Sequence, residues 1–151
     1  MRCDHYDAGT CRSCSLLPQP YERQLAGKEE AVAAALAPVP GAGNITWLAP
    51  ASSPDRGFRT SAKLVVGGTR RRPTLGILGP DRRGVDLPGC PIQHPAINRA
   101  TPGLKRFIRS LSLTPYDVPT KRGELKNILI TVGASEQTYF RRGRNGRIGY
   151  D

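Results

Sequence analysis

Four cysteines constrain this chain more than any other feature, because they tie two distant segments to one kind of chemistry. Cys3, Cys11 and Cys14 fall within the first fourteen residues, and Cys90 stands far downstream. A close group of three thiolates with one distant thiolate is a common way to hold an iron–sulfur cluster. The two residues between Cys11 and Cys14 let one short loop direct two sulfurs at the same centre. The pattern predicts a site that joins the N-terminus to the middle of the chain.

Other uses of four cysteines stay open at this point. A structural zinc held by four thiolates fits the count. Two disulfides fit the even number, but the first residues are polar and show no secretory signal, which disfavours disulfides. Clustering of the residues disfavours four unrelated thiols. His5 could also ligate a metal, although a single histidine in an exposed terminal segment is more often idle.

Composition indicates one modest domain with a thin core. The 151 residues are 38% hydrophobic with a single Trp, and 17 glycines and 14 prolines imply many turns. A metal site near the N-terminus would help such a chain fold. No stretch approaches the roughly 20 apolar residues of a membrane span, so we expect a cytoplasmic protein without a membrane partner.

The charge favours a polyanionic partner. A formal net charge of +11 arises from 23 basic and 12 acidic residues, which is typical of proteins that bind RNA or DNA. A basic protein without such a partner is the alternative. The candidate phosphate contacts lie in or beside predicted loops and strands: Arg59, Lys63, Arg70, Arg71, Arg72, Lys121, Arg122 and Lys126.

Periodicity predicts an α+β fold with a small, mainly antiparallel sheet and two helices. Trp47 is expected to anchor an edge of the core. Residues 133–151 form a basic Arg/Gly tail without apolar period and are expected to be disordered, leaving 1–132 as the folded region. The expected helices are residues 20–37, whose role would be packing, and 103–111; the expected strands are 62–66, 74–78 and 128–132.

Several stretches resemble one family. The segment from Cys3 to Cys14 is similar to the start of the bacterial 23S rRNA uracil-C5 methyltransferases, which belong to the iron–sulfur RNA uracil methyltransferases. It is most like the branch that modifies a uracil in the domain II hairpin. The resemblance covers roughly residues 1–132, follows the family's order, and continues through the blocks at 57–68, 75–78, 85–91 and 113–126.

The resemblance implies a 4Fe–4S cluster held by Cys3, Cys11, Cys14 and Cys90, with the N-terminal cysteine loop pinned by that cluster. It also implies a region that binds 23S rRNA beside a methyltransferase domain. Family members use S-adenosylmethionine as methyl donor and a cysteine nucleophile that adds to C6 of uracil.

This chain departs from the family pattern where catalysis is concerned. No cysteine follows Cys90, so no catalytic residue can be assigned, and the sequence ends before the family's donor-binding domain. We therefore expect a truncated chain or frameshift product that is inactive alone, which leaves its status as an enzyme uncertain. A stand-alone zinc or iron–sulfur module that binds nucleic acid is the alternative.

Overall fold

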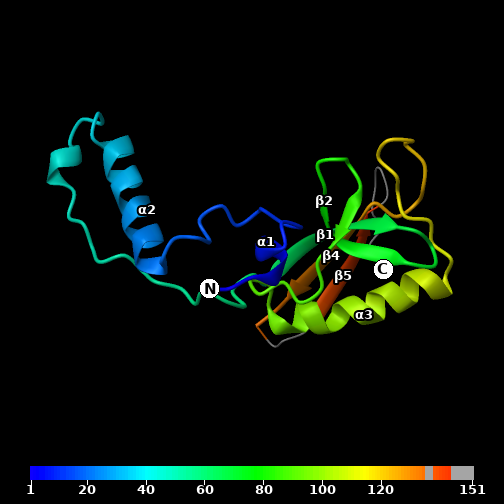
Figure 1. The fold of residues 1–151 in the computed structure, drawn as a ribbon. Helices are drawn as coiled ribbons and strands as arrows, with labels where there is room; N and C mark the ends of the chain where they lie inside the picture. The colour runs from blue at the N-terminus through cyan, green and yellow to red at the C-terminus, as the bar shows by residue number, and fades with distance from the viewer. Residues whose placement is uncertain (135–137, 144–151) are drawn as a thin grey trace.

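A computed structural model describes residues 1–134 and the backbone of residues 138–143. Its centre is a five-stranded antiparallel sheet in the order β3-β2-β1-β4-β5 (Figure 1). This confirms the α+β class, and the three predicted strands appear with slightly different bounds. The strands are β1 (Ser61–Gly68), β2 (Pro73–Leu78), β3 (Gly84–Asp86), β4 (Asn127–Val132) and β5 (Thr138–Gly143).

Strand β1 shows why one face of the sheet is buried. Ala62, Leu64 and Val66 are buried, whereas the alternate residue Lys63 is exposed. Successive side chains of a strand point to opposite faces, so this alternation aims the apolar residues at one side. Strand β4 alternates in the same way, and Ala62 pairs with Ile130 across the ladder.

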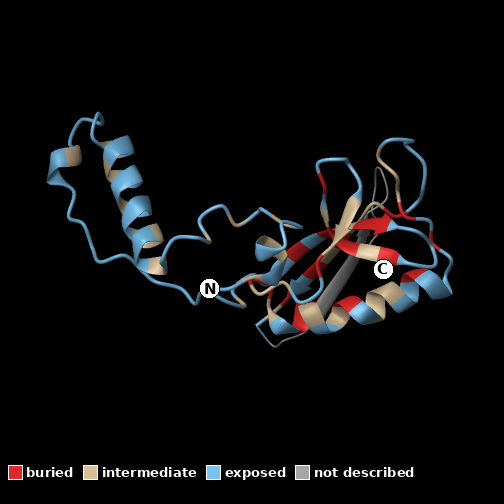
Figure 2. Ribbon diagram, viewed as in Figure 1, coloured by how far each residue is buried: buried red, intermediate tan, exposed pale blue. Residues whose placement is uncertain are grey.

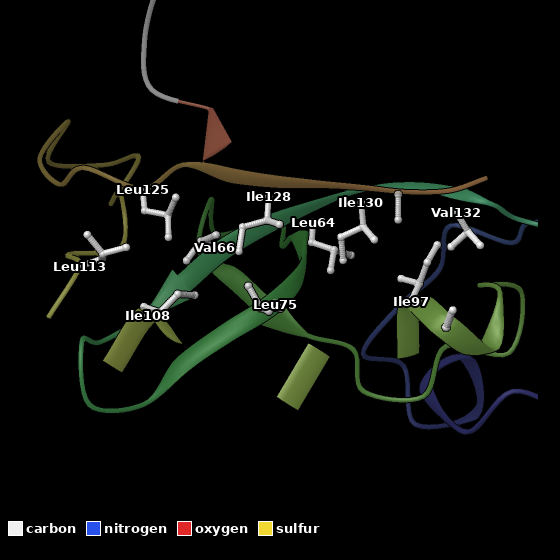
Figure 3. Packing of buried hydrophobic residues seen from close by; sticks show 12 residues of the cluster. Leu64, Val66, Leu75, Ile97, Ile108, Leu113, Leu125, Ile128, Ile130 and Val132 are labelled. Carbon is white, nitrogen blue, oxygen red and sulfur yellow. The ribbon is translucent and has the colours of Figure 1, made fainter. Parts of the chain in front are cut away.

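Helix α3 (Pro95–Ser110) covers the apolar face of the sheet (Figure 1). Ile97 and Ile108 are fully buried in the same cluster as Val66 and Ile130, and Figure 3 shows these side chains turned toward one another between helix and strands. The buried cluster consists of Ala62, Leu64, Val66, Leu75, Ala96, Ile97, Ile108, Leu113, Leu125, Ile128, Ile130 and Val132.

The prediction that this helix starts at Gly103 was wrong by about two turns. His94 caps the helix by accepting a hydrogen bond at Nδ1 from the Ala96 backbone N–H, and Pro95 occupies the first turn. The helix continues through Pro102. A proline inside a helix removes one backbone hydrogen bond. Here the burial of Ile97 and the first helical turns against the sheet outweighs that loss.

Before the sheet, residues 15–56 form an arm that projects away from it (Figure 1). The arm contains α2 (Tyr21–Leu36) and the short helix η1 (Ala42–Asn44), and it follows the four-residue helix α1 (Asp4–Asp7). The position of α2 agrees with the prediction, but its predicted packing role does not, because none of its residues is buried (Figure 2). Trp47 is 47% exposed, so it does not anchor the core.

The expected disorder beyond Gly133 is corrected for six residues. Thr138–Gly143 form β5, which pairs with β4 from Asn127↔Gly143 to Val132↔Thr138. Backbone groups of β5 make this ladder, so a basic composition does not prevent it. Residues 135–137 and 144–151 lie outside the described residues. Within the described part of the chain, no helix has the length and apolar character needed to cross a bilayer.

Candidate metal centre and basic surface

The N-terminal cysteine loop folds back on itself. Cys3 precedes α1, and its carbonyl accepts hydrogen bonds from the backbone N–H groups of Tyr6 and Asp7 at 3.0 Å. The Cys11 N–H then donates to the His5 carbonyl at 3.0 Å. These bonds fold residues 3–11 into a compact loop, which carries both Cys3 and Cys11.

The Cys90 segment is held against this loop. His5 Nε2 lies 2.7 Å from the carbonyl oxygen of Pro88. Asn98 of α3 donates from Nδ2 to the Cys90 carbonyl at 3.0 Å, and the Gln93 N–H donates to the same oxygen at 3.1 Å. The Cys90 backbone is therefore fixed from both sides, by the N-terminal loop and by the core helix.

All four cysteines line one cavity of about 20 Å³, together with Leu87 and other neighbours. That volume is enough for at least one water-sized atom. The four thiols are free and half-buried, so no disulfide joins them. The structure thus brings together Cys3, Cys11, Cys14 and Cys90, as the sequence predicted.

Electrostatics inside this cavity disfavour bare thiolates. Burial raises the pKa of the Cys14 thiol, and the neighbouring sulfurs of Cys90, Cys11 and Cys3 raise it further, while the Arg59 guanidinium opposes this. The other three sulfurs therefore lie within electrostatic reach of Cys14, and thiolates at these positions would repel one another. A cation that binds all four sulfurs would relieve this repulsion.

Burial likewise raises the pKa of the Cys90 thiol. Backbone N–H groups of Ile92 and Gln93 donate to its sulfur and oppose the shift. Hydrogen bonds of this kind stabilise a thiolate, and they are one of the means by which proteins tune metal–sulfur centres.

The cysteines share a cavity without forming a ready single-ion site. Among the described residues, no group of three or more His, Cys, Asp or Glu side chains is arranged to hold a metal ion. Thiolates around one zinc lie about 3.8 Å apart, because the Zn–S bond is about 2.3 Å and the geometry is tetrahedral. The negative finding holds for any metal ion, so it does not separate zinc from a cluster.

The predicted phosphate contacts separate into two groups at opposite ends of the sheet. Val65 pairs with Asn127, so the β1–β2 turn and the loop before β4 lie at the same end. Arg59 lies at the other end, where its backbone bridges Gln93 beside the Cys90 segment. At roughly 3.3 Å per residue, β1 separates the two ends by about 20 Å. The turn end carries Arg70, Arg71, Arg72, Lys121, Arg122 and Lys126, and Lys63 lies between the ends on the exposed face.

The loop before β4 is well ordered by its own contacts. Its backbone folds into a bridge between Asp117 and Arg122. Lys121 has a φ of 57°, a left-handed conformation that is uncommon outside glycine. Lys126 Nζ lies 4.9 Å from the centre of the Tyr116 ring, within the range of a cation–π contact.

Three neighbours of the cysteines were not assigned to the site from sequence. His5 was favoured as idle but bonds Pro88, and Asn98 orients Cys90 from a helical turn that the sequence did not predict. Arg59 was assigned to phosphate but lies within electrostatic reach of Cys14. Of these three neighbours, His5 alone had a signal in the sequence, which is its position between Cys3 and Cys11.

No protein-family profile matches this sequence. Its relatives include the 23S rRNA (uracil(747)-C(5))-methyltransferase RlmC of Yersinia pestis (strain Pestoides F), 45% identical over 139 residues. The RlmC of Halothiobacillus neapolitanus is 43% identical over 138 residues. These matches cover 92% and 91% of this chain but 35% of each relative, so the chain spans about a third of their length.

The fold is similar to a solved methyltransferase structure. The crystal structure of Pyrococcus abyssi tRNA (uracil-54, C5)-methyltransferase in complex with S-adenosyl-L-homocysteine matches with a TM-score of 0.68 and 22% identity. The match covers 87% of this chain and 31% of that one, and at this identity it supports the fold alone. The sequence identities to the curated relatives confirm the resemblance: over most of its length, this chain is a homologue of about a third of the RlmC 23S rRNA (uracil-C5)-methyltransferases.

Proposed function

We propose that this chain is the iron–sulfur and RNA-binding part of an S-adenosylmethionine-dependent 23S rRNA uracil-C5 methyltransferase. The observation that carries the proposal is the convergence of four cysteines from two distant segments on one cavity, in a chain that is 45% identical to an RlmC enzyme. In this proposal, Cys3, Cys11, Cys14 and Cys90 hold a 4Fe–4S cluster.

The resemblance to the iron–sulfur RNA uracil methyltransferases favours a cluster over zinc. Soft thiolates are the ligands of both. In a four-iron cluster, however, each thiolate binds its own iron, so the sulfurs lie farther apart than around a single ion. Four cysteines from two distant segments line one cavity, which supports a shared centre held by all four thiolates.

The role of the cluster in this proposal is structural. It ties the N-terminal loop to the segment that leads into α3 and so fixes the position of Arg59 at one end of the sheet. The cysteine ligand set is complete with four thiolates, which leaves no position for a substrate. The chain's own residues then bind and orient RNA, and methyl transfer requires the part of the relatives that this chain does not match.

The basic residues support a role in RNA binding. Arg70, Arg71 and Arg72 are exposed at a tight turn in which the Thr69 and Arg72 backbones bond each other at 3.1 Å. The turn lies at the same end of the sheet as Lys121. Arginine and lysine side chains on such ordered loops neutralise phosphates, and this produces a strong salt dependence of binding.

Metal analysis tests the cluster. The chain is purified anaerobically as wild type and as Cys90→Ala, and iron, sulfide, zinc and visible absorbance are measured. We expect about four iron and four sulfide per chain, as in a 4Fe–4S cluster, with an absorbance that Cys90→Ala abolishes. One zinc without sulfide would instead support the alternative, a stand-alone zinc module that binds nucleic acid.

Salt-dependent binding tests the RNA contacts. Affinity for a 23S rRNA hairpin is measured from low to high salt for wild type and for the triple variant Arg70→Ala, Arg71→Ala, Arg72→Ala. We expect weaker binding and a shallower dependence of log K on log salt, by about 0.7–0.9 per lost phosphate contact. The matched control is Arg23→Ala on α2, and equal slopes in all three proteins would contradict the assignment of the turn.

A further inference from the structure

A second and larger cavity lies beside the cysteine loop. Its volume is about 340 Å³, and its walls come from the turn after Cys14, the first half of α2 and the segment 53–58. Cavities of roughly 300–1,000 Å³ hold small organic ligands. Of the four cysteines, Cys14 lines this cavity as well as the smaller one, whereas the basic turn and loop lie at the far end of the sheet.

The walls of the cavity are joined by specific hydrogen bonds. The Ser53 backbone N–H donates to the Tyr21 hydroxyl at 2.9 Å, which joins the start of α2 to the segment that leads back to the sheet. Gln24 Nε2 donates to the Gln19 carbonyl at 3.0 Å. These bonds hold the two ends of the arm together, although none of α2 is buried in the core.

The lining combines two aromatic rings with the positive charge of Lys28. Tyr21 and Phe58 both line the cavity, and Phe58 is 49% exposed although it is a large apolar residue. Lys28 lies two turns after Tyr21 on the same face of α2, close enough for its charge to lower the Tyr21 pKa, after the larger effect of the Ser53 hydrogen bonds. Among the described residues, Lys28 has no hydrogen bond or ion pair.

We propose that this cavity binds one unpaired nucleotide of the RNA, and the inference rests on the proposed function. The base packs against Phe58 and Tyr21, since every base offers a flat face for aromatic stacking. The phosphate of the nucleotide binds the Lys28 ammonium. Polar groups at the rim, including Asp55, accept hydrogen bonds from the base edge.

The composition of the lining favours a nucleotide over a purely apolar ligand. Serines at 13, 15 and 53 and the carboxylate of Asp55 stand around the two rings. Some of these groups have a partner within the chain: Ser53 Oγ lies 3.4 Å from the Tyr21 hydroxyl, and Asp55 Oδ2 lies 3.7 Å from the Met1 ammonium. Each oxygen keeps further hydrogen-bonding capacity, which a nucleotide can use and an apolar ligand cannot. A nucleotide offers an apolar face, hydrogen-bonding edges and an anion in one group.

Binding of short RNA tests the inference. The full 151-residue chain, purified anaerobically, is titrated with fluorescent single-stranded RNA tetranucleotides of each base, with 5′-UMP, and with the rRNA hairpin. The variants are Phe58→Leu, which keeps apolar volume but removes the ring, and Lys28→Gln. The control is Arg23→Gln, which removes the same unit charge from the same helix without lining the cavity.

We expect Phe58→Leu to weaken tetranucleotide binding about tenfold, within the range of one stacked base. Lys28→Gln should weaken it and lower the salt slope by about 0.7, while Arg23→Gln leaves both nearly unchanged. Circular dichroism and thermal unfolding of each variant confirm that the fold persists.

Several outcomes would overturn the inference. Equal affinities of all variants for the tetranucleotides would contradict binding in this cavity. Weaker binding by Lys28→Gln alone would contradict base stacking and leave only a phosphate contact. Binding of 5′-UMP as tightly as the tetranucleotide would assign the cavity to a free nucleotide. Hairpin binding without tetranucleotide binding would overturn this site but keep the proposed function, whereas binding of neither RNA would contradict both.

Discussion

Lys105 Nζ of α3 lies 2.5 Å from Asp86 Oδ2 of β3. The other carboxylate oxygen, Oδ1, accepts a hydrogen bond from the Leu75 backbone N–H at 2.8 Å. Asp86 therefore joins the covering helix to two strands, four residues before Cys90. Charged hydrogen bonds of partly buried groups contribute more to stability than exposed ion pairs.

Replacing Asp86 tests this connection. We expect Asp86→Ala to lower the free energy of unfolding by about 2–3 kcal/mol, because it removes one charged hydrogen bond and leaves the Leu75 N–H unpaired. Lys105→Met should cost less, since its apolar chain keeps part of the packing. The measurement is urea unfolding followed by circular dichroism. The control is Arg106→Met, at an exposed position of the same helix, which should change stability by no more than about 0.5 kcal/mol.

His5→Ala should loosen the cysteine loop. The substitution removes the contact with the Pro88 carbonyl, so we expect a loss of about 1 kcal/mol and faster amide hydrogen exchange at residues 6–11. Iron content after anaerobic purification should fall as well. Asp4→Ala is the control, because Asp4 is exposed and makes only a long ion pair with Arg2. Unchanged exchange in His5→Ala would contradict a positioning role for the histidine.

Gly123 tests the loop before β4. Its φ is +114°, and a Cβ there would lie 2.2 Å from the Pro115 carbonyl oxygen. Gly123→Ala should therefore cost at least about 2 kcal/mol and weaken RNA binding by displacing Lys121. Gly103→Ala, inside α3 and without a close contact, should instead stabilise the chain by about 0.5–1 kcal/mol. The measurement is the change in thermal unfolding temperature of each variant relative to wild type.

The thiols should make the metal-free chain less stable at high pH. Burial raises the pKa of Cys14 and Cys90 in the folded state, whereas unfolded thiols titrate near about 8.5. The stabilising effect of these protons is thus complete below that pH and is lost as pH rises through the higher folded pKa. Urea unfolding under reducing, metal-free conditions from pH 7 to 10 should show this decline. The Cys14→Ser, Cys90→Ser double variant should show a smaller one, and identical slopes would contradict the shift.

The sequence by itself determined the local features of this protein. Short runs of apolar and β-branched residues, with a glycine-containing connection between the first two, predicted β1, β2 and β4. The cysteine spacing predicted a shared site for Cys3, Cys11, Cys14 and Cys90, and the ordered blocks predicted the family. These signals are local, or follow from residue type alone.

Tertiary structure decided what depends on contacts between distant segments. The start of α3 at Pro95 follows from burial of Ile97 against the sheet, which overrides the breaking tendency of Pro102. The pairing of β5 with β4 follows from backbone hydrogen bonds that composition does not encode. The exposure of Trp47 follows from its place on the arm of residues 15–56, which projects away from the sheet. Burial and strand pairing depend on which segments contact each other in the folded chain. The periodicity of one segment does not indicate which other segment it will contact.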